Sequence, residues 1–582
     1  MMATCTSDTA AERLQELKEW FSAHDIEYDS DAIELRVVGG DDRPSYAVFA
    51  KEDLDVEQTI CRIPKESVLS VRNCGIADIL EQAELGGVLG LAFCVMYEKS
   101  LGAKSPWAAY LRSLPESEHL PILWSEEDFS ALTGTDVEEQ TVRDRALLED
   151  DYATHVGPLV EEHGFPPEHF TYEKFLQAAS LVSSRAFEID AHHGESMVPL
   201  ADLFNHQTPT SLAEGEHVHF ETDADVCPYC GANGACYCED LEDEDDIEDV
   251  DEFDDEEGEE VVELVTDDED DEPPELYDPE DWMGHSDEHK DPASYAKTHE
   301  VDFLEMNLIR PCAAGEEVYN TYGEHGNDYL LSHYGFAEPK NPFDSVSLSM
   351  DAILDGLRSR LNPDRIEERC AFWTQVGRSV VESILDPEHE ESDDDDEEEV
   401  EDQEDDGEED EHSEDGSEDT EEPERDNFYF DFAGKASENL LAFLYVLFVD
   451  AAVFRAFTES TERFERYVHT LRNGGWIVKS TASGSSGPKG ARSAKGRGKP
   501  AQSTSGNSPL DRAISMTLLA LATGRDAMYP TTLEEDKSKL KKLAVSSATN
   551  CRRSALLLRI GEKEILARAK KNYMAAAPAS RR

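Results

Sequence analysis

The sequence has few basic residues for its length and contains no long uncharged apolar run. Its 582 residues include 51 Lys and Arg against 132 Asp and Glu, which gives a formal net charge of −81. Such a chain repels phosphate, so we do not expect nucleic acid as a direct partner. No uncharged apolar segment reaches the ~18 residues that span a bilayer, so we expect no membrane attachment. The nearest segment, 440–457, is interrupted by Asp450 and Arg455 and predicts a buried core helix.

The N-terminal segment and the cysteines indicate an intracellular protein. The start of the chain lacks a basic stretch followed by a continuous apolar one, so we expect no secretory signal. It predicts instead an amphipathic helix with Leu14, Leu17, Trp20 and Phe21 on one face. Seven of the eleven cysteines are scattered singly, which fits a reducing compartment better than a disulfide framework. We therefore expect a monomer in the nucleus, the cytoplasm or both.

The negative charge is concentrated in two segments. Residues 239–291 contain 31 Asp and Glu with one Lys, and residues 386–425 contain 27 with one Arg. Like-charge runs bury too little apolar surface to offset their ordering entropy, so both segments are predicted to be disordered. Residues 480–508, rich in Gly and Ser with several Lys and Arg, predict a flexible basic linker. A basic protein is the expected partner of so acidic a chain.

The hydrophobic pattern changes from β-rich to helical along the chain. Short β-branched runs separated by turn residues predict strands at 33–38, 46–50, 59–64, 67–71, 216–222, 301–309 and 316–322. Helical periodicity dominates in 76–190 and after about residue 346. Thr532 and Glu535 have the spacing of a helix capping box, and Leu533, Leu540 and Leu543 are expected on its core face. The pattern predicts an α+β fold with an N-terminal helix (1–32), a β-rich domain (33–345, helical insert 76–190) and an all-α domain (346–577).

Two distant stretches carry the chemistry. The first, "MVPLADLFNHQTPT" (197–210), ends an apolar run in Asn205 and His206, and the second is "GEEVYNTYGEHGNDYLLSHYGF" (315–336). Four further motifs accompany them along the chain: "SPWAAYLRSLP" (105–115), "PILWSEEDFSALTGT" (121–135), "SSRAF" (183–187) and "YPTTLEED" (529–536). Together they resemble SET-domain protein lysine methyltransferases of the Rubisco large-subunit methyltransferase type, most closely the fungal ribosomal-protein lysine methyltransferases.

The resemblance implies a fold and a set of functional residues. It covers most of 33–345 and, more thinly, 346–577, and implies a pseudoknotted SET domain followed by a helical substrate-binding domain. It implies S-adenosylmethionine as cofactor and Tyr322 as the catalytic residue. Cofactor contacts are implied for Ser45, Tyr46, Ala47, Arg185, Asp202, Asn205, His206 and Tyr322. A channel for the substrate lysine is implied for Tyr334 and Phe336.

Several of these residues allow a plainer interpretation. Arg185 is expected to pair with the methionine carboxylate as a fork, but a surface salt bridge would use the same side chain. Asp202 either orients a neighbour or is a satisfied buried carboxylate, and Phe336 either lines the channel or packs in the core. Ser45 and Ala47 stand where many members of the family have glycine, which leaves a degenerate, non-catalytic protein as an alternative.

Cys227, Cys230, Cys236 and Cys238 form a C-x2-C-x5-C-x-C cluster, with His217 and His219 shortly before it. Four thiolates at this spacing can enclose a tetrahedral zinc ion. The alternative is a reduced loop whose cysteines bind no metal.

We expect an S-adenosylmethionine-dependent protein-lysine N-methyltransferase that acts on a basic, non-histone protein, with a ribosomal protein favoured. Histones, an elongation factor and a histidine acceptor remain alternative substrates. A different class of function is an acidic chaperone or adaptor for basic proteins that keeps a SET scaffold without activity.

Overall fold

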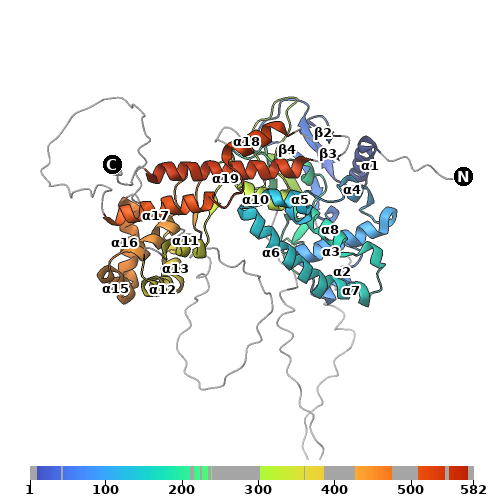
Figure 1. The fold of residues 1–582 in the computed structure, drawn as a ribbon. Helices are drawn as coiled ribbons and strands as arrows, with labels where there is room; N and C mark the ends of the chain where they lie inside the picture. Colours follow the sequence, from blue (N-terminus) through green and yellow to red (C-terminus); the bar gives the residue numbers. More distant parts are fainter. Residues whose placement is uncertain are drawn as a thin grey trace, which may run out of the picture.

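A computed structural model describes residues 9–40, 43–209, 215–222, 226–233, 238, 302–358, 361–385, 427–474, 509–543 and 549–574. Both acidic segments, the basic linker and Cys236 lie outside these residues, so the predictions about them stay predictions. The described part has two lobes: residues before about 340 form one, and most later helices form the other (Figure 1). The long helix α19 (Asn550–Met574) runs from the second lobe to the first and packs on α10, α17 and α18.

The first lobe combines short strands with a block of helices. Its strands are β1 (Glu27–Tyr28), β2 (Ile33–Gly40), β3 (Arg43–Ala50), β4 (Thr59–Pro64), β5 (Ala186–Glu188), β6 (Glu195–Met197), β7 (Val218–Glu221) and β8 (Phe303–Leu308). Its helices are α1 (Ala10–Ala23), α2 (Ala77–Gln82), α3 (Gly87–Leu101), α4 (Ala108–Ser113), α5 (Glu126–Phe129), α6 (Asp136–Asp151), α7 (Gly157–Glu162), α8 (Tyr172–Arg185) and α10 (Asn327–Tyr334). The predicted helical insert is therefore confirmed.

The strands form several small sheets. One sheet has the order β1-β4-β8-β7 with antiparallel neighbours, while β2 pairs with β3 and β5 with β6. The strands predicted at 67–71 and 316–322 are wrong. Leu69 forms a single bridge with Met197, and the second segment forms bridges from Glu317 and Asn320 to two different neighbours. Each bridge is an isolated pair of residues, so neither segment forms the consecutive pairs of a strand despite its β-branched residues.

Helix α1 confirms the predicted amphipathic face. Its buried residues are Leu14, Leu17, Trp20 and Phe21. Thr9 accepts a hydrogen bond from the Glu12 amide while the Glu12 carboxylate accepts one from the Thr9 amide, which completes a capping box. The helix therefore has a fixed start and one face in the core.

The second lobe is almost entirely helical. Its elements are β9 (Val346–Ser347), α11 (Met350–Leu357), α12 (Pro363–Phe372), α13 (Arg378–Leu385), β10 (Tyr429–Phe430), α14 (Glu438–Phe448), α15 (Ala451–Glu459), α16 (Thr461–Gly474), α17 (Pro509–Asp526), α18 (Leu533–Lys542) and α19. The single core helix predicted at 440–457 is two helices, because Asp450 accepts hydrogen bonds from two backbone amides and starts α15. Within the described residues no single helix passes a test of length and hydropathy for a membrane span, although α14 and α15, bent by 114°, pass it as a pair.

Helix α18 confirms the predicted capping box at Thr532 and Glu535. Its predicted core face is only half right, because Leu533, Leu540 and Leu543 are half-buried and Asp536 is fully buried. The Asp536 carboxylate accepts hydrogen bonds from Thr531, Arg559 and Lys563. A buried ion cluster thus fixes α18 on α19.

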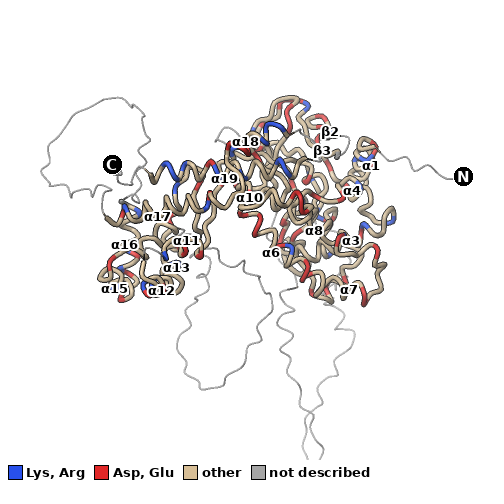
Figure 2. Tube along the Cα trace, in the orientation of Figure 1, with Lys and Arg blue, Asp and Glu red and all other residues tan. Residues whose placement is uncertain are grey.

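Charged side chains also join the two lobes. Arg525 on α17 pairs with Asp136 at the start of α6, with 2.7 Å between Nη2 and Oδ1. Figure 2 shows basic and acidic residues interspersed along both lobes. Most of the net charge of −81 lies elsewhere, because residues 239–291 and 386–425 carry −56 of it.

Candidate functional site

The two chemistry-bearing stretches meet in a parallel bridge between His206 and Asn320. The Asn320 amide donates to the Asn205 carbonyl at 2.9 Å, and the Gln207 amide donates to the Asn320 carbonyl at 3.1 Å. The bridge places the Asn-His pair beside the Tyr322 segment. The sequence predicted this crossing only through the resemblance, because no local pattern joins segments more than 100 residues apart.

His206 is held from both sides of its ring. Its Nδ1 accepts the Tyr322 amide hydrogen at 2.9 Å, so the proton must reside on Nε2, which donates to Thr208 Oγ1 at 2.9 Å. Burial, with a smaller contribution from His325, lowers the pKa of His206 to about 4. The imidazole is therefore neutral at physiological pH and serves as a fixed acceptor for the Tyr322 backbone.

Tyr322 is stacked between two aromatic rings. Its ring centroid lies 5.0 Å from His206 and 4.4 Å from Tyr334. The hydroxyl donates to the Phe204 carbonyl at 3.2 Å. Burial raises the pKa of Tyr322 well above its usual value, so the phenol keeps its proton and its oxygen stays a neutral dipole.

The Asn205 side chain has a defined orientation. Its Nδ2 donates to Glu317 Oε1 at 2.6 Å, and Glu317 Oε2 also accepts from the Tyr319 hydroxyl at 3.1 Å. Because a carboxylate only accepts, the amide nitrogen must face Glu317 and the amide oxygen must point away from it. Glu317 therefore fixes which atom Asn205 presents to the cavity.

Arg185 is paired with two carboxylates at the end of α8. Its Nε and Nη2 donate to Glu118 Oε1 at 3.0 and 2.6 Å, and its Nη1 donates to the Asp202 carbonyl at 3.2 Å. Arg185 Nη1 also lies 3.4 Å from Asp202 Oδ2, which accepts a hydrogen bond from the Tyr110 hydroxyl at 3.1 Å. The guanidinium edge expected to bind the methionine carboxylate therefore binds Glu118. The salt bridge between Arg185 and Glu118 is partly buried and does not lie on the open surface.

Asp202 is a buried carboxylate with one oxygen unused. Its side chain is fully buried. Burial raises the pKa of Asp202 to about 6, because it outweighs the lowering effect of Arg185. The Oδ1 atom has no hydrogen-bond partner in the described structure. Leu200, two residues earlier, has φ +79°, an uncommon value for a residue with a side chain, and begins the turn that delivers Asp202.

These side chains line a cavity of about 350 Å³. Its walls include Ser45, Tyr46, Arg185, Asp202, Asn205, His206, Tyr322, Tyr334 and Phe336. A second cavity of about 210 Å³ shares Arg185, Asp202, Tyr322 and Tyr334 with the first and adds Phe187 and Thr321. Tyr322 and Tyr334 therefore line both cavities.

Ala47 is the one predicted cofactor residue that does not line the larger cavity; it is fully buried in β3, opposite Arg36. Neither Ser45 nor Ala47 has a positive φ, so the extended backbone of β3 does not require glycine at these positions. The wall also includes Glu118, which the sequence analysis did not single out. Glu118 contacts Arg185 across 67 residues of sequence, and nothing in its own neighbourhood marks it.

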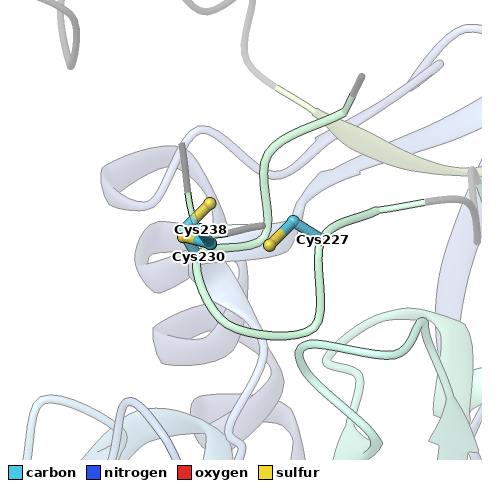
Figure 3. Close-up of side chains that lie close together, drawn as sticks. All are labelled: Cys227, Cys230 and Cys238. Atoms are coloured by element: carbon cyan, nitrogen blue, oxygen red, sulfur yellow. The ribbon is translucent and has the colours of Figure 1, made fainter. Parts of the chain in front are cut away.

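The predicted metal cluster is described for three of its four cysteines. Atoms Sγ of Cys227, Cys230 and Cys238 all lie within 4.8 Å of one another (Figure 3). Cys236 lies outside the described residues. His217 precedes the cluster in sequence, but its Nδ1 accepts a hydrogen bond from the Tyr319 amide. This ring nitrogen is therefore engaged by the segment that carries Tyr322.

A family model described as Rubisco LSMT substrate-binding matches residues 414–566. These residues are therefore similar to the Rubisco LSMT substrate-binding domain. Ribosomal lysine N-methyltransferase 3 of Saccharomyces cerevisiae is 26% identical over 375 residues, covering 60% of this chain and 66% of that relative. N-lysine methyltransferase SETD6 of Mus musculus is 24% identical over 343 residues, covering 56% of each. In both cases the chain spans less than two thirds of the relative's length.

Solved structures share the fold of the described residues. The SET domain of LSMT bound to lysine and AdoHcy has a TM-score of 0.56 at 16% identity, covering 97% of this chain and 91% of that one. Rubisco LSMT bound to AdoMet has a TM-score of 0.53, also at 16% identity, covering 97% and 92%. The predicted α+β fold, a SET domain followed by a helical substrate-binding domain, is confirmed, and so is the predicted family resemblance.

Proposed function

We propose that this protein transfers the methyl group of S-adenosylmethionine to a lysine ε-amine of a basic protein, with a ribosomal protein as the favoured substrate. The observation that carries the proposal is the bridge between His206 and Asn320, which brings Asn205, His206 and Tyr322 to the wall of one cavity. A solved relative bound to lysine and AdoHcy has the same fold, and relatives named lysine methyltransferases are homologous over more than half of the chain.

The residues of the larger cavity suit the cofactor. About 350 Å³ lies within the usual range of small-molecule sites. The amino group of the cofactor needs acceptors, and the cavity offers the amide oxygen of Asn205, which does not face Glu317. Its carboxylate needs donors, and Arg185 retains one N–H, on Nη2, beyond those given to Glu118 and Asp202. S-adenosylmethionine would supply an electrophilic methyl group at a sulfonium.

The protein must bind the substrate lysine with its amine neutral and in line with the methyl group. A free lysine has a pKa of ~10.4, so its deprotonation at pH 7 costs roughly 4–5 kcal/mol. A narrow aromatic space lowers this cost because burial disfavours the ammonium ion. Tyr334 and Phe336, whose ring centroids are 6.4 Å apart, both line the larger cavity, and Tyr334 stacks on Tyr322; they provide such walls.

Tyr322 is proposed to act by position and dipole rather than as a base. Its raised pKa keeps the hydroxyl protonated, and the stacked rings of His206 and Tyr334 hold it in place. During transfer the S–CH3 bond breaks, an N–CH3 bond forms and positive charge moves from sulfur to nitrogen. Oxygen dipoles, such as the Tyr322 hydroxyl and the Phe204 carbonyl that it contacts, stabilise a positive charge that moves in this way.

The substrate class rests on charge and on the relatives. A net charge of −81 attracts Lys- and Arg-rich proteins and repels nucleic acid. One relative is named a ribosomal lysine methyltransferase, and ribosomal proteins are basic. Action on such a substrate would take place in the nucleus, the cytoplasm or both.

A labelled-methyl transfer assay tests the proposal. Full-length protein is incubated with S-adenosylmethionine and, separately, with ribosomal proteins, elongation factors, histones and actin, the last as a histidine acceptor. We expect label in a ribosomal protein, lost in Asn205→Ala and reduced at least tenfold in Tyr322→Phe. Tyr429→Phe, in β10 and away from the cavity, is the matched control that should keep activity.

The alternative outcomes separate the competing functions. Label in another pool would keep the enzyme and replace the substrate. No label in any pool, together with no S-adenosylmethionine binding by calorimetry, would favour the acidic adaptor that keeps the SET scaffold without activity.

A further inference from the structure

The loop after β7 has a defined structure that gathers cysteine sulfurs. Val226 and Asn233 form an antiparallel bridge, and between them the Cys227 amide donates to the Ala232 carbonyl at 2.9 Å. The Gly231 amide donates to the Cys227 carbonyl at 2.8 Å. The turn therefore places Cys227 and Cys230 on the same side of a closed loop, and Cys238 returns to them (Figure 3).

The glycine of this turn is required by its surroundings. Gly231 has φ +70°, where side chains are strained, and a Cβ atom there would lie 2.8 Å from Cδ2 of the His192 ring. His192 Nδ1 lies 3.0 Å from the Pro228 carbonyl, and the Arg72 side chain donates to the His192 carbonyl at 2.7 Å. The loop is therefore packed on the turn that joins β5 and β6.

We infer that Cys227, Cys230 and Cys238 bind a structural zinc ion. Three Sγ atoms lie within 4.8 Å of one another, and a tetrahedral zinc–thiolate site needs sulfurs about 3.8 Å apart, given Zn–S bonds of about 2.3 Å. Closing the three sulfurs onto an ion takes movements of about 1 Å or less, within the reach of side-chain rotation. Thiolates at C-x2-C spacing are the preferred zinc ligands of small loops.

The proposed ion has a structural task. It ties Cys238 to the loop after β7, which packs on the β5–β6 turn, and β5 follows directly after Arg185. Cys238 directly precedes the acidic segment 239–291 in sequence, so the ion would also anchor the residue at which that segment begins. This inference concerns metal binding and does not rest on the proposed methyl transfer.

Metal analysis of the full-length protein tests the site. Wild-type protein, exposed to zinc and then desalted, should retain about one zinc per chain. Cys230→Ser, at an exposed position, should retain less than ~0.2, whereas Cys551→Ser, the same change elsewhere, should retain as much as the wild type. A chelator should lower the melting temperature of the wild type and of Cys551→Ser but leave that of Cys230→Ser unchanged.

A second variant tests the loop without removing a thiol. Gly231→Ala strains the turn and meets the His192 ring, so zinc affinity measured by competition with a chromophoric chelator should fall about 5- to 30-fold. Affinity should also fall as the pH is lowered, because each thiol loses a proton on binding.

Any of the following results would overturn the inference. The first is less than ~0.2 zinc per chain in the zinc-exposed wild type. The second is equal zinc content in wild type and Cys230→Ser. The third is iron in place of zinc, or a disulfide between Cys230 and Cys238 in a non-reducing peptide map.

Discussion

The backbone N–H of Tyr322 donates a 2.9 Å hydrogen bond to Nδ1 of His206, 116 residues earlier in the chain. The bond requires a neutral imidazole with its proton on Nε2, where Thr208 accepts it. Protonation of His206 would place a second hydrogen against the Tyr322 amide and break this contact. The position of Tyr322 therefore depends on the charge state of His206.

Stability should depend on pH through His206. Its folded-state pKa of about 4 lies below the ordinary 6.5, so the unfolded chain binds the proton first as pH falls. The stabilisation is complete above about pH 6.5 and is lost as pH falls through about 4, with a total on the order of 3 kcal/mol. His206→Phe should remove this slope and, by leaving the Tyr322 amide unpaired, cost about 1–3 kcal/mol at pH 7.

Thermal melts of both proteins between pH 4 and 8 measure this effect. His469→Phe, on the exposed surface of α16, is the matched control and should keep the wild-type slope. An unchanged slope in His206→Phe would show that His206 is not buried in its neutral form.

Glu317 should control cofactor binding without touching the reacting atoms. Its carboxylate forces the Asn205 amide nitrogen toward itself and leaves Oδ1 for the cavity. In Glu317→Gln the new amide can donate or accept, so Asn205 populates both orientations and the cofactor loses an acceptor. We expect the dissociation constant for S-adenosylmethionine to rise about 2- to 5-fold, because only the fraction of the protein with Oδ1 toward the cavity offers that acceptor.

Isothermal calorimetry of S-adenosylmethionine binding measures this change. Glu316→Gln, one residue earlier and exposed, is the control and should bind like the wild type. Equal affinity in Glu317→Gln would mean that Asn205 is oriented by other contacts.

The sequence predicted those features that repeat locally or belong to the quoted motifs. Helical periodicity located the buried face of α1, and the Thr532–Glu535 spacing located a helix start, because both signals lie within a few residues. Glu317 and Glu118 were missed because their partners lie 112 and 67 residues away. Only the fold brings such pairs together, and a lone glutamate in an acidic chain carries no signal of its own.

Asp536 shows the limit of the hydrophobic pattern in another way. The pattern placed leucines in the core face of α18, yet the fully buried residue is a carboxylate whose cationic partners lie on α19. A charge is expected at the surface unless its partners are known, and Arg559 and Lys563 are more than 20 residues away. Burial of this aspartate follows from tertiary pairing.

Asp536→Ala should therefore be strongly destabilising. It leaves the buried cations of Arg559 and Lys563 without a counter-charge, which typically costs about 3–5 kcal/mol. Glu459→Ala removes an exposed ion pair with Arg463 and should cost less than about 1 kcal/mol. Chemical denaturation followed by tryptophan fluorescence compares the two, and similar losses would contradict the proposed role of the cluster.

Deletion of the acidic segments 239–291 and 386–425 should weaken capture of a basic substrate. These segments carry −56 of the net charge, and charge steering accelerates association by ~10-fold or more at low ionic strength. We expect a KM for a Lys-rich substrate that rises about tenfold in low salt and little in high salt, because salt screens the attraction. A variant with Ser and Gly in place of the acidic residues separates charge from length; normal kinetics in that variant would make the segments spacers.

The junction between the lobes should respond to pH in the opposite sense from His206. Glu562 on α19 is buried against Tyr529 and lies 3.9 Å from Arg525, which also pairs with Asp136 of the first lobe. Burial and the charge of Asp136 outweigh Arg525 and raise the pKa of Glu562 to about 8. The folded chain therefore holds a proton that the unfolded chain releases near pH 4.5, and stability present below that pH is lost as pH rises through about 8.

Glu562→Gln keeps the shape and the hydrogen bond of the protonated side chain, so it should abolish the loss of stability between about pH 4.5 and 8. Glu564→Gln, two residues along the same helix and paired with Lys537 near the surface, should keep that loss. Melting temperatures across this range measure both variants. Identical pH profiles for wild type and Glu562→Gln would mean that Arg525 holds Glu562 ionised, and that the contact between the lobes is an ion pair at every pH tested.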